Sequence, residues 1–185
     1  MQMKKDLITI ANVTLKILSK KSWNLLTVSD VKKNSKIKEF DKLIDKKKSL
    51  LRNINNYFDY LLLLQIKEID DSNQKDMIFE IFMLRFDILE NNRKAINSIF
   101  ISFKKKPKEL FFLLPSLLDS IILMAKYSNI SNKGFVGQIR MKGLLIIYCA
   151  TFFTWINDNN SSLEKTMTTL DQYLNQAENI VKFIK

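Results

Sequence analysis

The chain has 185 residues, of which 46% are hydrophobic and 26% charged, and its formal net charge is +11. It contains no histidine and one cysteine, Cys149, so the commonest general base is missing and no internal disulfide or Cys-x-x-Cys metal site can form. The sequence also shows no nucleophile–base pair and no glycine-rich phosphate loop. We therefore expect a protein that is not an enzyme and that uses no metal and no cofactor. A lone cysteine in an apolar run fits a reducing, cytoplasmic setting.

Three glycines and two prolines in the whole chain predict a nearly all-α fold, because few turns need a positive φ and few helices are broken. The spacing of apolar residues predicts a helix in each of nine segments, with a polar break over residues 70–73. In chain order the predicted helices cover residues 4–20, 28–34, 37–44, 46–69, 75–91, 92–104, 107–127, 136–157 and 161–182.

Local signals place some of these helix boundaries. Thr27 and Asp30 have the spacing of a capping box that opens the second helix, and Ser161 and Glu164 have the same spacing before the last helix. Pro115 predicts a kink or a break within the seventh helix. The longest apolar run, residues 143–156, is shorter than the roughly 18–20 residues of a membrane span, so no transmembrane segment is expected.

The positive charge is concentrated at the beginning of the chain. Residues 1–55 contain fourteen Lys and Arg against five Asp and Glu, a net of +9, whereas residues 56–185 contain sixteen against fourteen, a net of +2. A small cationic helical segment joined to a larger, nearly neutral apolar one indicates one part that meets a polyanion and one that forms a core, a dimer or a pocket.

About 45 residues at the beginning of the chain resemble the DNA-binding domain of the TetR family. The residues that carry this resemblance are Ala11, Leu15, Trp23, Thr27, Val28, Asp30, Val31, Phe40, Ile44, Lys47, Leu50 and Leu51. The resemblance implies a TetR-like fold, with a three-helix helix-turn-helix head over residues 1–48 and a helical-bundle body of about six helices over residues 49–185. It also implies that the third helix enters the major groove of DNA, that Lys47 contacts a phosphate and that Thr27 is a cap near the DNA backbone.

The sequence departs from the family at the turn between the second and third helices. The family has a glycine there, whereas Asn34, Ser35 and Lys36 stand in its place, and the segment from Val31 to Phe40 is about two residues short. The missing length falls where base-reading residues lie. Phosphate binding needs cations within reach of the DNA backbone and is less sensitive to such a change. The candidate DNA-binding residues are Thr27, Lys32, Lys33, Lys36, Lys38, Lys46, Lys47 and Lys48. The alternative is that these lysines form an ordinary solvated surface. Four carboxylates lie among them and would weaken the positive field.

The body, from about residue 76 to residue 177, is similar to a second family, the TetR-like accessory proteins of coenzyme Q biosynthesis. The similarity is clearest over residues 83–86, 140–148, 158–162 and 166–171. It implies an isoprenoid lipid or another apolar small molecule held in the helical body, without catalysis. The amphipathic membrane helix that ends those proteins has no counterpart here beyond Lys182, Phe183 and Lys185.

An apolar stripe at helical spacing forms either a ligand pocket or a filled core, and the sequence leaves both open. Tyr148 and Trp155 are the better pocket candidates, because each has a polar group that could orient a ligand. The last two helices are expected to form a homodimer through a two-fold four-helix interface, with Gly143 permitting close approach. The candidate ligand-binding residues are Phe82, Phe86, Leu113, Leu117, Ile121, Met124, Tyr148, Phe152 and Trp155.

Two functions remain as hypotheses. The first is a TetR-like transcriptional regulator that binds duplex DNA through its head and responds to a ligand in its body, and the charge asymmetry favours it. The second is a lipid-binding accessory protein of ubiquinone biosynthesis that has lost specific DNA readout, and the altered turn and third helix favour it.

Overall fold

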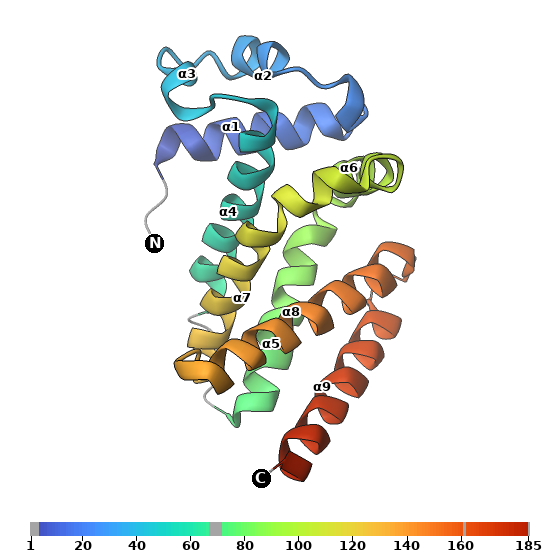
Figure 1. Cartoon of the computed structure of the whole chain (residues 1–185). Helices are drawn as coiled ribbons and strands as arrows, with labels where there is room; N and C mark the ends of the chain where they lie inside the picture. The colour runs from blue at the N-terminus through green and yellow to red at the C-terminus, as the bar shows by residue number, and fades with distance from the viewer. Residues whose placement is uncertain (1–3, 67–71, 161, 185) are drawn as a thin grey trace. The chain divides into compact units, whose positions relative to one another are not determined.

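The computed structural model describes residues 4–66, 72–160 and 162–184, with backbone alone for residues 105, 107, 109, 110 and 180–184. Every regular element in these ranges is a helix, which confirms the predicted all-α fold (Figure 1). The elements are α1 (Lys5–Leu18), η1 (Trp23–Leu25), α2 (Val28–Ser35), α3 (Phe40–Leu43), α4 (Lys47–Gln65), α5 (Gln74–Glu90), α6 (Arg93–Lys105), η3 (Pro107–Phe112), α7 (Leu114–Tyr127), α8 (Gly134–Asn157) and α9 (Glu164–Ile184).

Most predicted helices lie within two or three residues of the observed ones, and the differences have local causes. The third predicted helix, residues 37–44, is reduced to the four residues of α3, because Lys36 takes a left-handed conformation and the chain resumes a helix at Phe40. The seventh predicted helix is divided into η3 and α7, so the break expected from Pro115 is present. Pro115 lies in the first turn of α7, where a missing N–H costs no hydrogen bond.

The chain packs as two compact units, each built from two segments. The first unit comprises Met1–Leu64 and Ile88–Leu117, and the second comprises Gln65–Asp87 and Leu118–Lys185. The whole predicted head lies in the first unit. The domain boundary predicted at residue 48 separates a DNA-binding head from a ligand-binding and dimerisation body, and it stays a prediction.

The core of the first unit forms around α1. Ile10 and Ala11 are fully buried, and Leu18 and Trp23 are 2% exposed. This apolar face of α1 contacts both α2 and α6. In Figure 1, α2 and α3 lie on one side of α1 and α6 lies on the other. The α1 helix therefore joins the lysine-rich segment to the rest of its unit.

Two hydrogen bonds attach α1 and η1 to helices distant in sequence. The Asn53 side chain of α4 donates to the Leu7 carbonyl of α1 at 3.0 Å. The backbone N–H of Trp23 donates to the Ser98 hydroxyl of α6 at 3.1 Å. Trp23 is the first residue of η1, so its N–H has no partner within that turn and the Ser98 hydroxyl satisfies it.

The second unit is built around α8, which packs along α9. Met141, Tyr148 and Trp155 recur at seven-residue intervals on α8 and are each at most 4% exposed. By length and composition α8 could cross a membrane, although the predicted apolar run was shorter. One such helix is weak support for a membrane span, because the core helix of a soluble protein passes the same test.

One glycine in α8 is required by close packing. A Cβ on Gly137 would lie 2.3 Å from the backbone carbonyl carbon of Asn132, far inside van der Waals contact. At Gly143, by contrast, a Cβ would meet nothing within 4 Å. The first glycine permits the tight entry into α8, whereas the second lies on an open face of the unit.

The start of α9 is bonded to the buried carboxylate of Asp158. Ser161, the first residue of the predicted capping box, lies outside the described residues. Buried Asp158 accepts hydrogen bonds from the backbone N–H of Thr166 at 3.0 Å and from its hydroxyl at 2.9 Å. Burial acts to raise the pKa of Asp158, but these hydrogen bonds outweigh it and the net pKa lies below the ordinary value.

Candidate nucleic-acid interface

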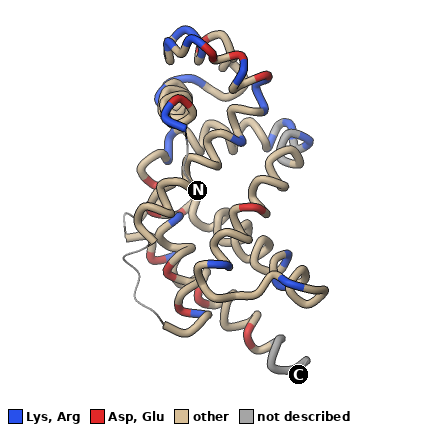
Figure 2. Tube along the Cα trace, turned by 90° about the vertical axis from the view of Figure 1, so that its left-hand side faces the viewer, with Lys and Arg blue, Asp and Glu red and all other residues tan. Residues whose placement is uncertain are grey.

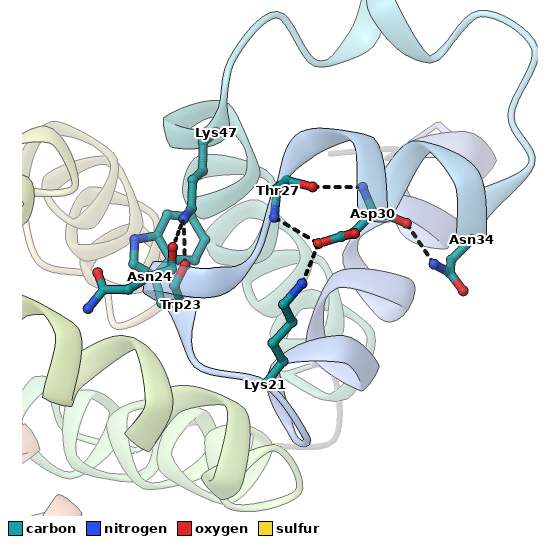
Figure 3. A network of polar contacts seen from close by, with 7 residues as sticks. All are labelled: Lys21, Trp23, Asn24, Thr27, Asp30, Asn34 and Lys47. Atoms are coloured by element: carbon teal, nitrogen blue, oxygen red, sulfur yellow. Dashed lines mark hydrogen bonds and ion pairs between the residues drawn. The ribbon is translucent and has the colours of Figure 1, made fainter.

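The second helix begins at the predicted capping box, which the structure confirms (Figure 3). The Thr27 hydroxyl accepts from the Asp30 N–H at 3.1 Å, and the Asp30 carboxylate accepts from the Thr27 N–H at 3.0 Å. The Lys21 ammonium also bonds Asp30, at 2.7 Å. This ammonium, followed by the backbone and hydroxyl of Thr27, lowers the pKa of Asp30 to about 2. The entry to α2 is therefore held by an ionised carboxylate at every physiological pH.

The second helix ends at Lys36, within the segment where the resemblance leads us to expect a glycine. Lys36 has φ 55° and ψ 27°, the left-handed conformation that glycine adopts without strain. Its backbone N–H closes the helix on the Lys32 carbonyl at 3.2 Å. The turn after α2 therefore has a backbone conformation that favours glycine, at a residue that adds a cation and has a conformational cost.

The third helix presents little polar surface for reading bases. It has one turn, and its exposed polar residues are Asp41 and Lys42. Asp41 pairs with Lys32 of α2 at 2.5 Å, and Lys42 pairs with Glu39 at 2.6 Å. Both side chains thus have partners inside the head, which fits a weak contribution to base readout.

The four carboxylates of residues 28–48 each hold a particular lysine. Three of these ion pairs are described above, and in the fourth the Asp45 carboxylate lies 3.5 Å from the Lys46 ammonium. The pairs are Asp30–Lys21, Asp41–Lys32, Glu39–Lys42 and Asp45–Lys46. All are solvent-accessible pairs, whose net attraction is small. The carboxylates therefore neutralise specific lysines rather than the head as a whole.

Three candidate lysines have neither a carboxylate nor any other side-chain partner among the described residues. Lys33, Lys36 and Lys38 are exposed and lie within six residues at the end of α2 and in the following turn. Figure 2 shows basic positions, with some acidic ones among them, at the end of the trace that carries α2 and α3 in Figure 1. Exposed ammonium groups close together without carboxylate partners are suited to contact a sugar-phosphate backbone.

Lys47, the phosphate contact implied by the resemblance, lies against the η1 turn. Its ammonium donates to the Trp23 carbonyl at 2.5 Å and to the Asn24 carbonyl at 3.3 Å, and it lies 4.8 Å from the centre of the Trp23 ring (Figure 3). The side chain is half-buried. In this conformation it connects α4 to the head, and its phosphate contact stays a prediction.

Lys48 has an aromatic partner. Its ammonium lies 3.0 Å from the centre of the Phe112 ring of η3, and both residues are exposed. A cation over an aromatic face contributes modestly at the surface. Lys48 therefore keeps its charge on the outside of the first unit, where it adds to the field of the head.

The predicted ligand-binding residues are distributed over both units. Seven belong to the second unit, and Leu113 and Leu117, which are half-buried, belong to the first. Ile121 and Met124 of α7 are fully buried. Whether the nine residues line one cavity stays a prediction.

The aromatic candidates in the second unit pack on one another. The Phe86 ring stacks on Tyr148 at 5.2 Å and lies 6.2 Å from Trp155, while Phe82 meets Tyr148 edge-on at 5.4 Å. Phe152 lies 5.3 Å from Trp155. Such spacings are those of aromatic pairs in a packed interior.

Sequence reasoning missed two residues that matter to the site. Arg85 is 1% exposed, and its Nε donates to the Tyr148 hydroxyl at 3.2 Å, which places a cation beside the aromatic cluster. Lys21 fixes the capping box through Asp30. Both act across more than one helix, so local spacing carries no signal for them.

The order of helices and the geometry of the head define a TetR-like fold. A comparison with solved structures supports this class. The chain superposes with a TM-score of 0.69 on the crystal structure of the TetR transcriptional regulator from Nitrosomonas europaea ATCC 19718, covering 92% of this chain and 96% of that one at 16% sequence identity. No family model and no curated protein matches the sequence. At this identity the likeness shows the fold.

Proposed function

We propose that this protein is a transcriptional regulator that binds duplex DNA through the lysines at the end of α2 and in the turn to α3. The observation that supports it best is the group formed by Lys33, Lys36 and Lys38, which are exposed and have no carboxylate partner in the described head. The TetR-like fold adds to it, because the structural neighbour is a TetR regulator.

The end of α2 and the short α3 are unequally suited to contact DNA, and this difference determines the binding mode that we expect. The cations at the end of α2 can neutralise phosphates, whereas α3 has one turn and both of its exposed polar side chains form ion pairs. Phosphate contacts give affinity without sequence information, and base contacts give specificity. We therefore expect affinity dominated by the salt-sensitive phosphate term, with modest preference between sequences.

Dimerisation would be provided by α8 and α9. Ile139, Ile146 and Phe153 lie seven residues apart on α8 and are 54%, 69% and 53% exposed. Met167 and Tyr173 are exposed apolar residues on α9. An apolar stripe at this spacing is what a two-fold helical interface buries. A dimer would present two heads to successive turns of a duplex.

The experiment that tests this function is fluorescence anisotropy with a labelled 30-base-pair duplex at several salt concentrations. We expect micromolar or tighter binding near 100 mM salt, falling steeply towards 200 mM. Flat, negligible binding at low salt would reject the proposal.

The lipid-binding alternative has one observation in its favour. Arg85 and Tyr148 form a buried polar pair beside the rings of Phe82 and Phe86, so a ligand that entered this interior would meet a donor next to apolar side chains. Native mass spectrometry of the purified protein tests it. A co-purified isoprenoid would support this alternative, and its consistent absence would count against it.

A further inference from the structure

An open groove lies in the first unit between the end of α1, the η1 turn and α6. Its volume is about 390 Å³, within the range of pockets that hold small molecules. Its lining contains lysines, serines and asparagines with two aliphatic side chains. The lining residues are Leu18, Ser19, Lys20, Lys21, Ser22, Asn24, Lys94, Asn97, Ser98, Ile101 and Ser102. We refer to it as the α1–α6 groove.

Three lysines and no carboxylate are among the residues that line this groove. Lys20 and Lys94 are exposed, and neither forms an ion pair or a side-chain hydrogen bond within the described part of the chain. Lys21, the third, is held by Asp30 from outside the lining. The Ser22 hydroxyl and the amides of Asn24 and Asn97 add neutral donors, whereas the other lining serines donate to backbone carbonyls. This combination is complementary to a compact dianion such as a phosphate group.

The groove is also anchored, which gives it a fixed shape. Ser98 at its base accepts from the Trp23 N–H at 3.1 Å and donates to the Lys21 carbonyl at 3.3 Å. The Ser102 hydroxyl is bonded to the Ser98 carbonyl at 3.0 Å. One residue of α6 thus fixes the backbone of the turn that carries two of the lysines, so this side of the groove is formed before a ligand binds.

We propose that the α1–α6 groove binds a small phosphorylated metabolite. The phosphate would lie between Lys20, Lys21 and Lys94, and the remainder of the molecule would lie against Ile101, which is 50% exposed. In Figure 1 α6 lies on the other side of α1 from α2 and α3, the segment that carries the lysines assigned to DNA. We therefore take a free phosphorylated metabolite, and not the DNA backbone, as the occupant.

An occupant would communicate with the head through Lys21. The same ammonium bonds the Asp30 carboxylate that caps α2 (Figure 3), and a phosphate in the groove would compete for it. Binding would then loosen the entry to the helix that leads into the proposed DNA contacts. This effect goes beyond the proposed function, and the binding step itself can be measured without DNA.

Isothermal titration with inorganic pyrophosphate at constant ionic strength tests the site. We expect saturable binding of one pyrophosphate per chain, weakened about tenfold or more in the double variant K20Q/K94Q. The matched control, K16Q/K126Q, removes two exposed lysines outside the groove and should change the affinity less than twofold. All four side chains are exposed, so both variants should unfold at the wild-type temperature.

Three results would overturn the proposal. The first is a titration that does not saturate, and the second is equal weakening in the two double variants. The third comes from repeating the titration with a saturating 30-base-pair duplex present. If the duplex displaces pyrophosphate and K20Q/K94Q also abolishes DNA binding, the groove belongs to the DNA interface. Retained pyrophosphate binding beside the duplex would support a separate small-molecule site.

Discussion

Lys47 of α4 donates a hydrogen bond to the main-chain carbonyl of Trp23, 24 residues earlier, and its ammonium lies 4.8 Å from the centre of the indole ring. The Trp23 N–H is bonded to Ser98 of α6. One short turn therefore connects α4 and α6 to the head. Lys47, for which the resemblance implies a phosphate contact, therefore has a structural role in this conformation.

We predict that Lys47→Met lowers the free energy of unfolding by about 1–2 kcal/mol, because it removes charge-assisted hydrogen bonds and a cation–π contact at a half-buried position. Chemical denaturation measures the change. Lys46→Met, at an exposed neighbouring position with a surface ion pair, is the control and should stay within about 0.5 kcal/mol of wild type. Equal stability of the two variants would show that the turn does not depend on Lys47.

The same pair of variants separates the structural role from phosphate binding. If Lys47 also contacts a phosphate, Lys47→Met reduces the slope of log affinity against log salt by about one. If it serves the turn alone, the slope stays at the wild-type value while the stability falls.

Lys36→Gly should stabilise the fold, because glycine adopts the observed left-handed conformation without the side-chain clash. We expect a gain of up to about 1 kcal/mol, part of which is offset by the greater freedom of glycine in the unfolded chain. The same change removes one of the three unpaired lysines, so DNA affinity should fall while the melting temperature rises. A variant that melts earlier than wild type would contradict the assigned backbone conformation.

The capping box makes stability depend on pH through Asp30. Because the folded pKa is lowered to about 2 from 3.8, the ionised carboxylate contributes its full stability above pH 3.8 and loses it as the pH falls towards 2. The stability advantage of wild type over Asp30→Asn should therefore shrink between pH 5 and pH 2. Urea denaturation at a series of pH values measures it, and a constant advantage across this range would refute the assignment.

The two α8 glycines test close packing and dimerisation separately. Gly137→Ala should destabilise strongly, by about 2 kcal/mol or more, since the new Cβ would meet the Asn132 backbone. Gly143→Ala meets nothing within the chain and should raise helix stability slightly. If Gly143 lies in the α8–α9 dimer interface, Gly143→Ala will weaken self-association, which analytical ultracentrifugation measures. Unchanged association would place the interface elsewhere.

Local patterns in the sequence were enough for the architecture. Apolar spacing and the scarcity of glycine and proline predicted the all-α fold, and Thr27 and Asp30 predicted the start of α2, because these signals act within one or two turns. The length of α3 was overestimated. Its apolar spacing continued through Ile37, but the left-handed Lys36 delays the helix until Phe40.

The candidate site was predicted less completely, since its geometry depends on contacts between helices. The lysine cluster is visible in the sequence, yet the sequence does not say which lysines are neutralised. Asp41 forms an ion pair with Lys32, nine residues earlier, and Asp30 forms one with Lys21 at the same separation. The Ser98–Trp23 bond that shapes the α1–α6 groove spans 75 residues. Such partners are fixed by tertiary packing and leave no local pattern.

The central claim is that Lys33, Lys36 and Lys38 contact DNA phosphates, and the salt dependence of duplex binding by K33Q/K36Q/K38Q tests it most directly. The control, K104Q/K126Q/K133Q, removes the same charge from exposed positions elsewhere. We predict that the first variant lowers the slope of log affinity against log salt by about three, while the control leaves it close to wild type. Equal slopes for the two triple variants would contradict the account.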